Sequence, residues 1–180
     1  MPEYVILVDE HDRETGLEEK LKAHELGLLH RAFSVLIFNS QGKLLLQQRA
    51  AHKYHSPLLW TNTCCSHPRK GESIPDAADR RLQEEMGMKA GLQKVFSFIY
   101  KADMENGLTE HEFDHVLIGF SDTDPQINPE EVHQFRWESL ETIKKEIQQH
   151  PADFTTWFRL LIRDHEQKIL AHENLQKRNI

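Results

Sequence analysis

Residues 61–72, TNTCCSHPRKGE, carry two adjacent cysteines and, two residues after the second, a histidine. These residue types could hold a metal, form a redox pair, supply a catalytic thiol, or pack in the core. Cys64 and Cys65 are the only cysteines in the sequence. A bridge between neighbours would close almost no loop, so a disulfide framework is excluded. A zinc finger or ribbon requires further, spaced cysteines. We therefore expect a pair of reduced thiols.

A second group of chemically active residues is the motif EHE at residues 110–112. Because side chains alternate along a strand, Glu110 and Glu112 should point the same way. Two carboxylates at such a short separation repel each other unless a cation or a proton lies between them. The motif therefore favours a metal site, a shared proton or exposure to solvent. The chain has 12 histidines, enough for a metal site, although most are expected on polar surfaces.

A third group lies on a helix predicted over residues 74–86, with Ser73 as its N-cap and Gly87 as its stop. Arg81, Glu84 and Glu85 share one face of this helix, because they are spaced i, i+3 and i+4. The glutamates are hard oxygen ligands, whereas Arg81 is a fork-shaped cation suited to phosphate. Taken alone, this face could also be an ion-paired surface, worth roughly a few tenths of a kcal/mol.

The other elements that must position these residues alternate between strands and helices. The expected strands are four or five residues within 4–9, then 31–39, 43–49, 95–102 and 111–120. Three further helical segments are expected: a short polar helix or irregular arm at 17–25, a helix ending at Pro151, and one in the last thirty residues. Turn residues 39–42 should join two of the strands into a hairpin, and residues 51–71 should form a loop. This order predicts an α/β or α+β fold with a mixed sheet covered by helices.

The composition is that of an ordinary globular protein, with 38% hydrophobic and 28% charged residues in a chain of 180. That length suits one domain, residues 1–180. A net charge of −7 does not favour a nucleic-acid partner. No apolar run approaches the roughly 18 residues of a membrane span, and the N-terminus lacks the features of a signal peptide. We expect no membrane partner and a cytoplasmic location.

The segment from Ser66 to Met88 resembles the Nudix box, G-x5-E-x7-R-E-U-x-E-E-x-G-U, in which U is a bulky aliphatic residue. The sequence fits the box at Glu72, Arg80, Leu82, Glu84, Glu85, Gly87 and Met88. It departs from the box at Ser66, in place of glycine, and at Arg81, in place of glutamate. In Nudix hydrolases three glutamates on this face clamp magnesium against a diphosphate. With Arg81, the resemblance implies a scaffold that holds a diphosphate but is poorly equipped to hydrolyse it.

Four further segments, HRAFSVLIFN, LLLQQR, WTNTCCSHP and TEHEFDHVL, extend the resemblance to residues 4–157. Together with the altered box they are similar to the type 1 isopentenyl-diphosphate isomerases of the Nudix superfamily. That family interconverts isopentenyl diphosphate and dimethylallyl diphosphate, through protonation of the alkene to a tertiary carbocation. The resemblance implies a Nudix-like mixed sheet flanked by helices. The chemistry needs an acid and a base on opposite faces of a dry pocket, aromatic side chains, and cations for the diphosphate.

The resemblance also implies the catalytic residues. The family's catalytic cysteine lies two residues before the histidine, which selects Cys65 and leaves Cys64 as packing. A cysteine pKa falls beside a cation or metal, which would favour the thiolate. Glu112 would be the acid–base residue on the opposite face of the pocket. Tyr100 could donate a hydrogen bond to Glu112, and Trp157 could stabilise the cation by about 2 kcal/mol. Tyr100 and Trp157 could equally be ordinary residues of a sheet and a helix core.

Ligands follow from the same resemblance. The implied metal ligands are His24, His30, His67, Glu110 and Glu112. Mixed nitrogen and oxygen ligands suit Mn2+ or Zn2+. The implied diphosphate contacts are Lys20, Arg49, Lys53 and Arg81. A second ion, Mg2+, would be held by the diphosphate and Glu85. We expect a monomer or a small homo-oligomer.

Two other functions stay open. A Nudix pyrophosphohydrolase is disfavoured by Arg81 and Cys65, because the first removes a metal-binding carboxylate. A catalytically silent Nudix domain that senses a metal or nucleotide is disfavoured by the intact pair Cys65 and Glu112.

Overall fold

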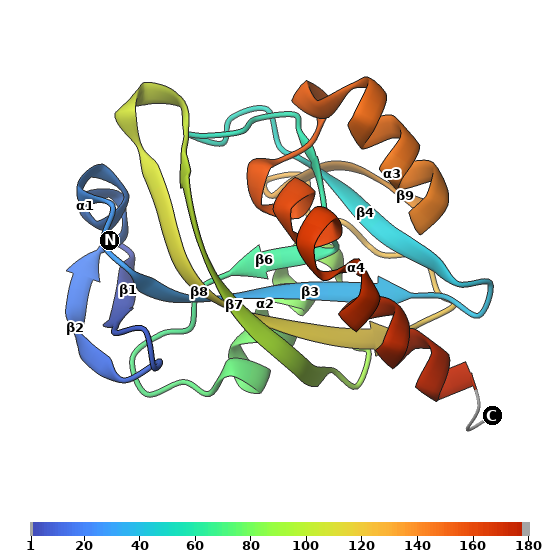
Figure 1. The fold of residues 1–180 in the computed structure, drawn as a ribbon, viewed down its shortest axis with the longest axis horizontal. Coiled ribbons are helices and arrows are strands. Elements are labelled where there is room, and N and C mark those ends of the chain that lie inside the picture. Colours follow the sequence, from blue (N-terminus) through green and yellow to red (C-terminus); the bar gives the residue numbers. More distant parts are fainter. Residues whose placement is uncertain (1, 178–180) are drawn as a thin grey trace.

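The structure is a computed structural model that describes residues 2–177, with side chains described up to residue 173 of the last helix. Within this range the chain forms one mixed sheet of nine strands, with helices on both faces (Figure 1). The strands are β1 Tyr4–Val8, β2 Glu14–Glu19, β3 His30–Phe38, β4 Lys43–Arg49, β5 Trp60–Thr61, β6 Cys64–Ser66, β7 Gln93–Asp103, β8 Thr109–Phe120 and β9 Val132–Ser139. The α-helices are α1 Lys20–Leu26, α2 Ile74–Met86, α3 Leu140–Gln149 and α4 Thr156–Lys177.

Strand β3 organises the sheet, because four other strands pair with it. It runs parallel to β8 over its whole length and antiparallel to β6 over three residues. It meets β1 and β4 at one residue pair each. Its sequence HRAFSVLIF is almost wholly buried, as expected for a strand covered on both faces.

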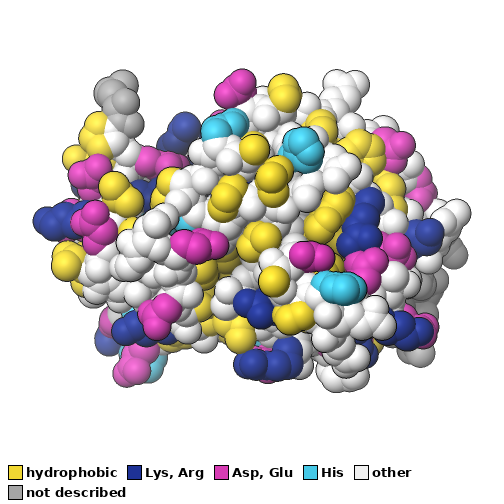
Figure 2. All heavy atoms as spheres, turned by 90° about the horizontal axis from the view of Figure 1, so that it is seen from above, with side chains coloured by type: hydrophobic (Ala, Val, Ile, Leu, Met, Phe, Trp, Pro, Cys, Tyr) yellow, Lys and Arg dark blue, Asp and Glu magenta, His cyan; other side chains and the backbone are white. Residues whose placement is uncertain are grey.

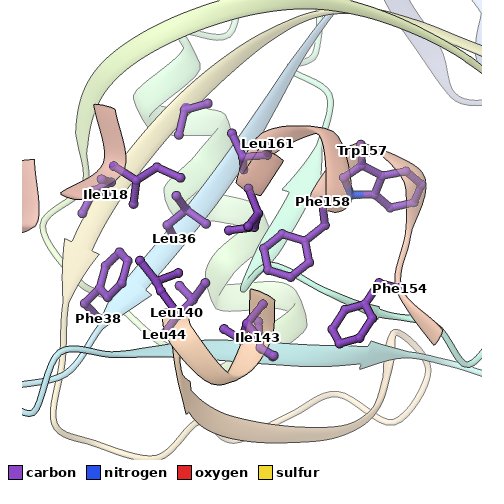
Figure 3. Close-up of a cluster of buried hydrophobic side chains, with 14 of the residues drawn as sticks. Leu36, Phe38, Leu44, Ile118, Leu140, Ile143, Phe154, Trp157, Phe158 and Leu161 are labelled. Carbon is purple, nitrogen blue, oxygen red and sulfur yellow. The ribbon is translucent and has the colours of Figure 1, made fainter. Parts of the chain in front are cut away.

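The two faces of the sheet carry separate hydrophobic cores. On one face, Phe33 and Val35 of β3 pack against Leu82 of α2. On the other, Leu36 of β3 packs with Phe158 of α4, in a cluster that also takes in α3 (Figure 3). Burying one such side chain stabilises the fold by roughly 1.5–3 kcal/mol. The predicted mixed α/β class, with helices flanking a mixed sheet, is confirmed.

Helix α2 has the predicted bounds, and its two ends explain why. The Ser73 hydroxyl accepts a hydrogen bond from the Asp76 backbone N–H at 3.3 Å, which satisfies one free donor of the first turn. Gly87 ends the helix with a φ of 62°. A Cβ atom at residue 87 would also lie 2.6 Å from the Gln126 backbone oxygen. Glycine is therefore required both for the left-handed turn and for the close approach.

Several predicted boundaries were wrong. Residues 17–19 belong to β2 rather than to the polar helix, which begins at Lys20. Residues 136–139 end β9 rather than begin the helix before Pro151. The predicted loop 51–71 contains the short strands β5 and β6. The hairpin of β3 and β4 has the predicted turn, but only Phe38 and Leu44 pair across it, because β4 pairs along its length with β9.

The surface drawn in Figure 2 mixes acidic and basic side chains with scattered hydrophobic ones. None of the helices between residues 2 and 177 combines the length and hydrophobicity needed to cross a bilayer.

Candidate active site

One cleft collects residues from almost every part of the fold, and it encloses about 620 Å³ including the part open to solvent. The predicted residues that line it are Lys20, Arg49, Lys53, Cys65, His67, Arg81, Glu85, Tyr100, Glu110, Glu112 and Trp157. The other two predicted residues, His24 and His30, are fully buried and contact the cleft residues from behind. The structure thus brings all the predicted site residues together.

Three imidazoles and one carboxylate converge at one end of the cleft. His24, His30, His67 and Glu112 each offer a ligand atom within 4.8 Å of the others, and we call them the histidine cluster. His67 Nε2 lies 3.2 Å from His30 Nε2 and 3.0 Å from the Glu112 carboxylate. Glu110, also a predicted ligand, lies just outside this group, 3.6 Å from His24 Nε2.

Two of these imidazoles are oriented by backbone carbonyls. His24 Nδ1 lies 2.6 Å from the Lys20 oxygen, and His30 Nδ1 lies 2.8 Å from the Leu28 oxygen. A carbonyl accepts only, so each Nδ1 carries a proton, and Nε2 is the ring nitrogen of each that could bind a metal. His24 Nε2 is buried without a hydrogen-bond partner. This mixed set of nitrogen and oxygen donors fits a divalent metal.

The two glutamates of EHE share one tyrosine. The Tyr100 hydroxyl lies 2.7 Å from Glu112 Oε2 and 3.0 Å from Glu110 Oε2. Burial and the charge of Glu112 raise the pKa of Glu110. Burial opposes ionisation of Glu112 as well, but the neighbouring His30 and Tyr100 lower its pKa to about 2. Two carboxylates this near to each other titrate as a pair, and a shared proton or a cation lowers the repulsion between them.

The two cysteines face opposite sides of the sheet. Cys64 is fully buried in the core under α2. Cys65 is half-buried and lines the cleft. Burial raises the pKa of the Cys65 thiol, and the Arg49 charge only partly offsets it. The expected lowering of this pKa is therefore wrong for this structure, because desolvation outweighs the nearby cation. The thiol form of Cys65 is therefore favoured over the thiolate here.

Four cations also line the cleft, Lys20, Arg49, Lys53 and Arg81, which we call the cation cluster. Carboxylates neutralise three of them. Lys20 pairs with Glu3 at 2.9 Å, Lys53 pairs closely with Glu131, and Arg81 pairs with Glu84 and Glu85, each at 2.6 Å.

Arg49 is bound differently from the other cations. Its guanidinium donates to the backbone oxygens of His55 and Ser56, each at 3.2 Å. It also lies 5.3 Å from the centre of the Trp157 ring, and Trp157 itself is only 4% exposed. Arg49 thus fastens the loop after β4 to the wall of the cleft.

Sequence reasoning missed five cleft residues: Gln47, Tyr54, His55, Ser66 and Glu131. Gln47 donates to Glu85 at 2.8 Å and so fixes the second carboxylate of the Nudix-like helix. His55 and Glu131 lie in segments without periodicity, and no spacing connects them to the predicted residues. Their contacts form only when the chain is folded.

Comparison with known proteins gives one family. A family model described as the NUDIX domain matches residues 28–158. A protein from Serratia proteamaculans named isopentenyl-diphosphate Delta-isomerase is 53% identical over 164 residues, which are 91% of this chain and 92% of the relative. A protein of the same name from Pectobacterium atrosepticum is 52% identical over 156 residues, 87% of each chain.

Solved structures agree on the fold. A crystal structure of DR0079 from Deinococcus radiodurans has a TM-score of 0.74 at 22% identity, and covers 91% of this chain and 99% of its own. A MutT protein from Methanosarcina mazei has a TM-score of 0.64 at 18% identity, over 78% of this chain and 94% of its own.

Proposed function

The chain belongs to the Nudix family and, within it, to the isopentenyl-diphosphate Delta-isomerases, and on this premise we propose how its cleft performs the reaction. It interconverts isopentenyl diphosphate and dimethylallyl diphosphate. The observation that carries the proposal is the arrangement of the cleft, where an acid–base pair, Cys65 and Glu112, lies beside a cation cluster.

In the proposed reaction, Cys65 and Glu112 serve opposite sides of the alkene. One donates a proton to the terminal carbon, which leaves a tertiary carbocation. The other removes a proton from the carbon on the far side, which restores a double bond at the new position. Because the reaction is reversible, each residue is donor in one direction and acceptor in the other. Trp157 presents its ring to the hydrocarbon part and stabilises the cation, an effect of about 2 kcal/mol when water is excluded.

The histidine cluster would hold Mn2+ or Zn2+, with Glu110 as a further ligand. Bound there, the metal supplies positive charge that orders Glu112 and tunes its acidity. Tyr100 holds the same carboxylate from the neighbouring strand. The side chains of this end of the cleft thus fix the position of one proton carrier.

The cation cluster would bind the diphosphate, with Mg2+ held between the diphosphate and Glu85. The charged end of the substrate is then anchored while its hydrocarbon end reaches the acid–base pair. Arg81 supports isomerisation over hydrolysis, because its ion pairs with Glu84 and Glu85 occupy the face on which Nudix hydrolases carry a third carboxylate.

The proposal includes the remaining expectations from the sequence. One domain, residues 1–180, would act in the cytoplasm as a monomer or a small homo-oligomer, without a nucleic-acid or membrane partner. A reduced pair of cysteines supports the cytoplasmic location.

Incubation with isopentenyl diphosphate, Mg2+ and Mn2+ in deuterated water, followed by NMR of the alkene, tests the function directly. We expect dimethylallyl diphosphate to form with deuterium incorporated. Phosphate release without isomerisation would favour a pyrophosphohydrolase, and no change in the substrate would sink the proposed activity.

A further inference from the structure

His55 enters the cleft from the loop between β4 and β5, most of whose other residues are exposed or half-buried. Its neighbours Tyr54 and Leu58 are 44% and 43% exposed, whereas His55 is 6% exposed and lines the cleft. Arg49 holds the loop there through the backbone oxygen of His55. Ser56 and Leu58 have φ values of 49° and 58°, which are unfavourable for residues other than glycine. The fold thus maintains a strained loop that buries this imidazole.

The buried ring faces two residues of the proposed reaction. His55 Nε2 lies 3.3 Å from Glu110 Oε1, and the ring meets the Trp157 ring edge to face at 5.8 Å. His55 does not belong to the histidine cluster, whose ligand atoms gather around Glu112. It contacts Glu110 Oε1, the oxygen that also lies 3.6 Å from His24 Nε2, whereas Tyr100 contacts Oε2.

The proton on His55 is directed toward the carboxylate. His55 Nδ1 lies 3.4 Å from the Ser56 hydroxyl, which can donate to it and leave the proton on Nε2. The contact of Nε2 with Glu110 is long for a hydrogen bond. Such contacts in unliganded sites tighten when the reacting complex forms.

We propose that His55 is a positioning residue for the isomerisation, which directs its Nε2–H to Glu110 and holds that carboxylate beside Glu112. The inference rests on the proposed function, and it gives the loop after β4 a part in the reaction. Without His55, Glu110 would lose its contact with the loop after β4 and would keep the Tyr100 hydroxyl, which it shares with Glu112. It could then rotate away from Glu112, and the acid–base centre would lose its second carboxylate.

The substitutions His55→Leu and His55→Gln separate this role from simple packing. Leucine fills the space without a donor, whereas the glutamine amide reaches the place of Nε2. We expect His55→Leu to lower kcat by about 10- to 100-fold, the range for losing a hydrogen bond to a charged group. The KM for isopentenyl diphosphate should change less than about threefold, because the cation cluster is untouched. His55→Gln should recover most of the loss.

His52→Leu is the matched control, since His52 lies in the same loop with 61% of its side chain exposed, and this variant should keep full activity. A second measurement is a double-mutant cycle: His55→Leu should cost little further activity in a Glu110→Gln background, because both act through one carboxylate. Additive losses would overturn the proposal, and so would unchanged kcat in His55→Leu. Weakened Mn2+ binding equal to that of His67→Ala would make His55 a metal ligand instead.

These outcomes are separate from the fate of the proposed function, which the unmodified protein decides in the deuterium assay. If His55→Leu failed to fold, the comparison of His55→Gln with the unmodified protein would decide the matter. A kcat for that variant as low as that of Glu110→Gln, with the fold intact, would contradict the donor role.

Discussion

Cys65 and Glu112 lie on the two strands that flank β3, and their side chains emerge on the same face of the sheet. Cys65 of β6, which runs antiparallel to β3, pairs with Ser34 of β3. Glu112 of β8, which runs parallel to β3, pairs with His30 of β3. Paired residues share a face, and Ser34 and His30 are an even number of positions apart. The two proton carriers therefore lie on either side of β3, and their partners on β3 are four positions apart.

Removing either proton carrier should abolish isomerisation. We expect Cys65→Ala and Glu112→Gln each to lower kcat by about 10²- to 10⁴-fold, the usual contribution of general acid–base catalysis. Deuterium incorporation followed by NMR measures both variants. Cys64→Ala is the control: it should keep most of its activity and lose roughly 1 kcal/mol of stability, because Cys64 lies in the core under α2 and not in the cleft. Full activity in either Cys65→Ala or Glu112→Gln would contradict a mechanism in which the two residues transfer protons on opposite sides of the alkene.

Glu131 should compete with the diphosphate. Its carboxylate pairs with Lys53 and lies 3.4 Å from Arg81, so it occupies two members of the cation cluster. We expect Glu131→Gln to bind inorganic pyrophosphate about tenfold more tightly in calorimetry at low salt, since roughly 1.4 kcal/mol of competing ion pairing would be removed.

The neighbouring Glu130 supplies the control for that experiment. Its side chain is 84% exposed, so Glu130→Gln changes the net charge by the same amount without touching the cation cluster. Equal gains for the two variants would mean that net charge, rather than competition at Lys53 and Arg81, sets the affinity.

Divalent metal should stabilise the fold through the histidine cluster. Three imidazoles and a carboxylate crowd together there, and a ligand that binds only the folded state raises stability by RT ln(1 + [L]/Kd), about 2.7 kcal/mol at a hundredfold excess over Kd. Chelation should therefore lower Tm, and added Mn2+ or Zn2+ should restore it. In His67→Ala this response should largely vanish, whereas His133→Ala, outside the cluster, should respond like the unmodified protein.

His115 should make stability fall in mild acid. Burial and the charge of Lys94 lower its pKa to about 4, while Asp12, 3.0 Å away, opposes the shift and Arg31 supports it. In the unfolded chain a histidine has a pKa of about 6.5. The stabilising effect is complete above pH 6.5 and is lost as the pH falls toward 4, because the unfolded chain binds the proton first.

The size of that effect is at most about 3 kcal/mol, because one pKa unit corresponds to 1.36 kcal/mol. Urea unfolding of the metal-free protein at a series of pH values would measure it. His115→Gln should lose less stability than the unmodified protein between pH 6.5 and 4. Identical slopes for the two proteins would show that other groups carry the acid sensitivity.

The sequence was sufficient for elements whose signals are local. Ser73, Gly87 and a four-residue apolar step predicted α2 with its observed bounds. Strands β2 and β9 were missed because ETGLEE and VHQFRWES carry little alternation. They exist because β1 and β4 offer backbone partners over five and seven residue pairs, and such pairing is a property of the folded sheet rather than of either segment.

Some residues of the site could be predicted from local motifs, whereas others reach the cleft only in the folded chain. Cys65 and His67, and likewise Glu110 and Glu112, are close in sequence, so motifs could select them. His55 and Glu131 reach the cleft through contacts with residues 55 and 78 positions away, Glu110 and Lys53. The raised pKa of Cys65 was also beyond the motif, because desolvation depends on all the atoms that surround a thiol in the folded protein.

Strand β3 supplies residues to both faces of the sheet, so an insertion or deletion within β3 would disturb both faces. Its residues alternate between the face of the sheet that carries the cleft, with His30 and Ser34, and the core under α2, with Phe33 and Val35. Inserting or deleting one residue there would exchange the two sets at once. Imidazole and hydroxyl groups would then face α2, and aromatic and aliphatic groups would face the proton carriers. A substitution in β3 changes one side chain, whereas a change in its length moves every side chain beyond that point to the other face of the sheet.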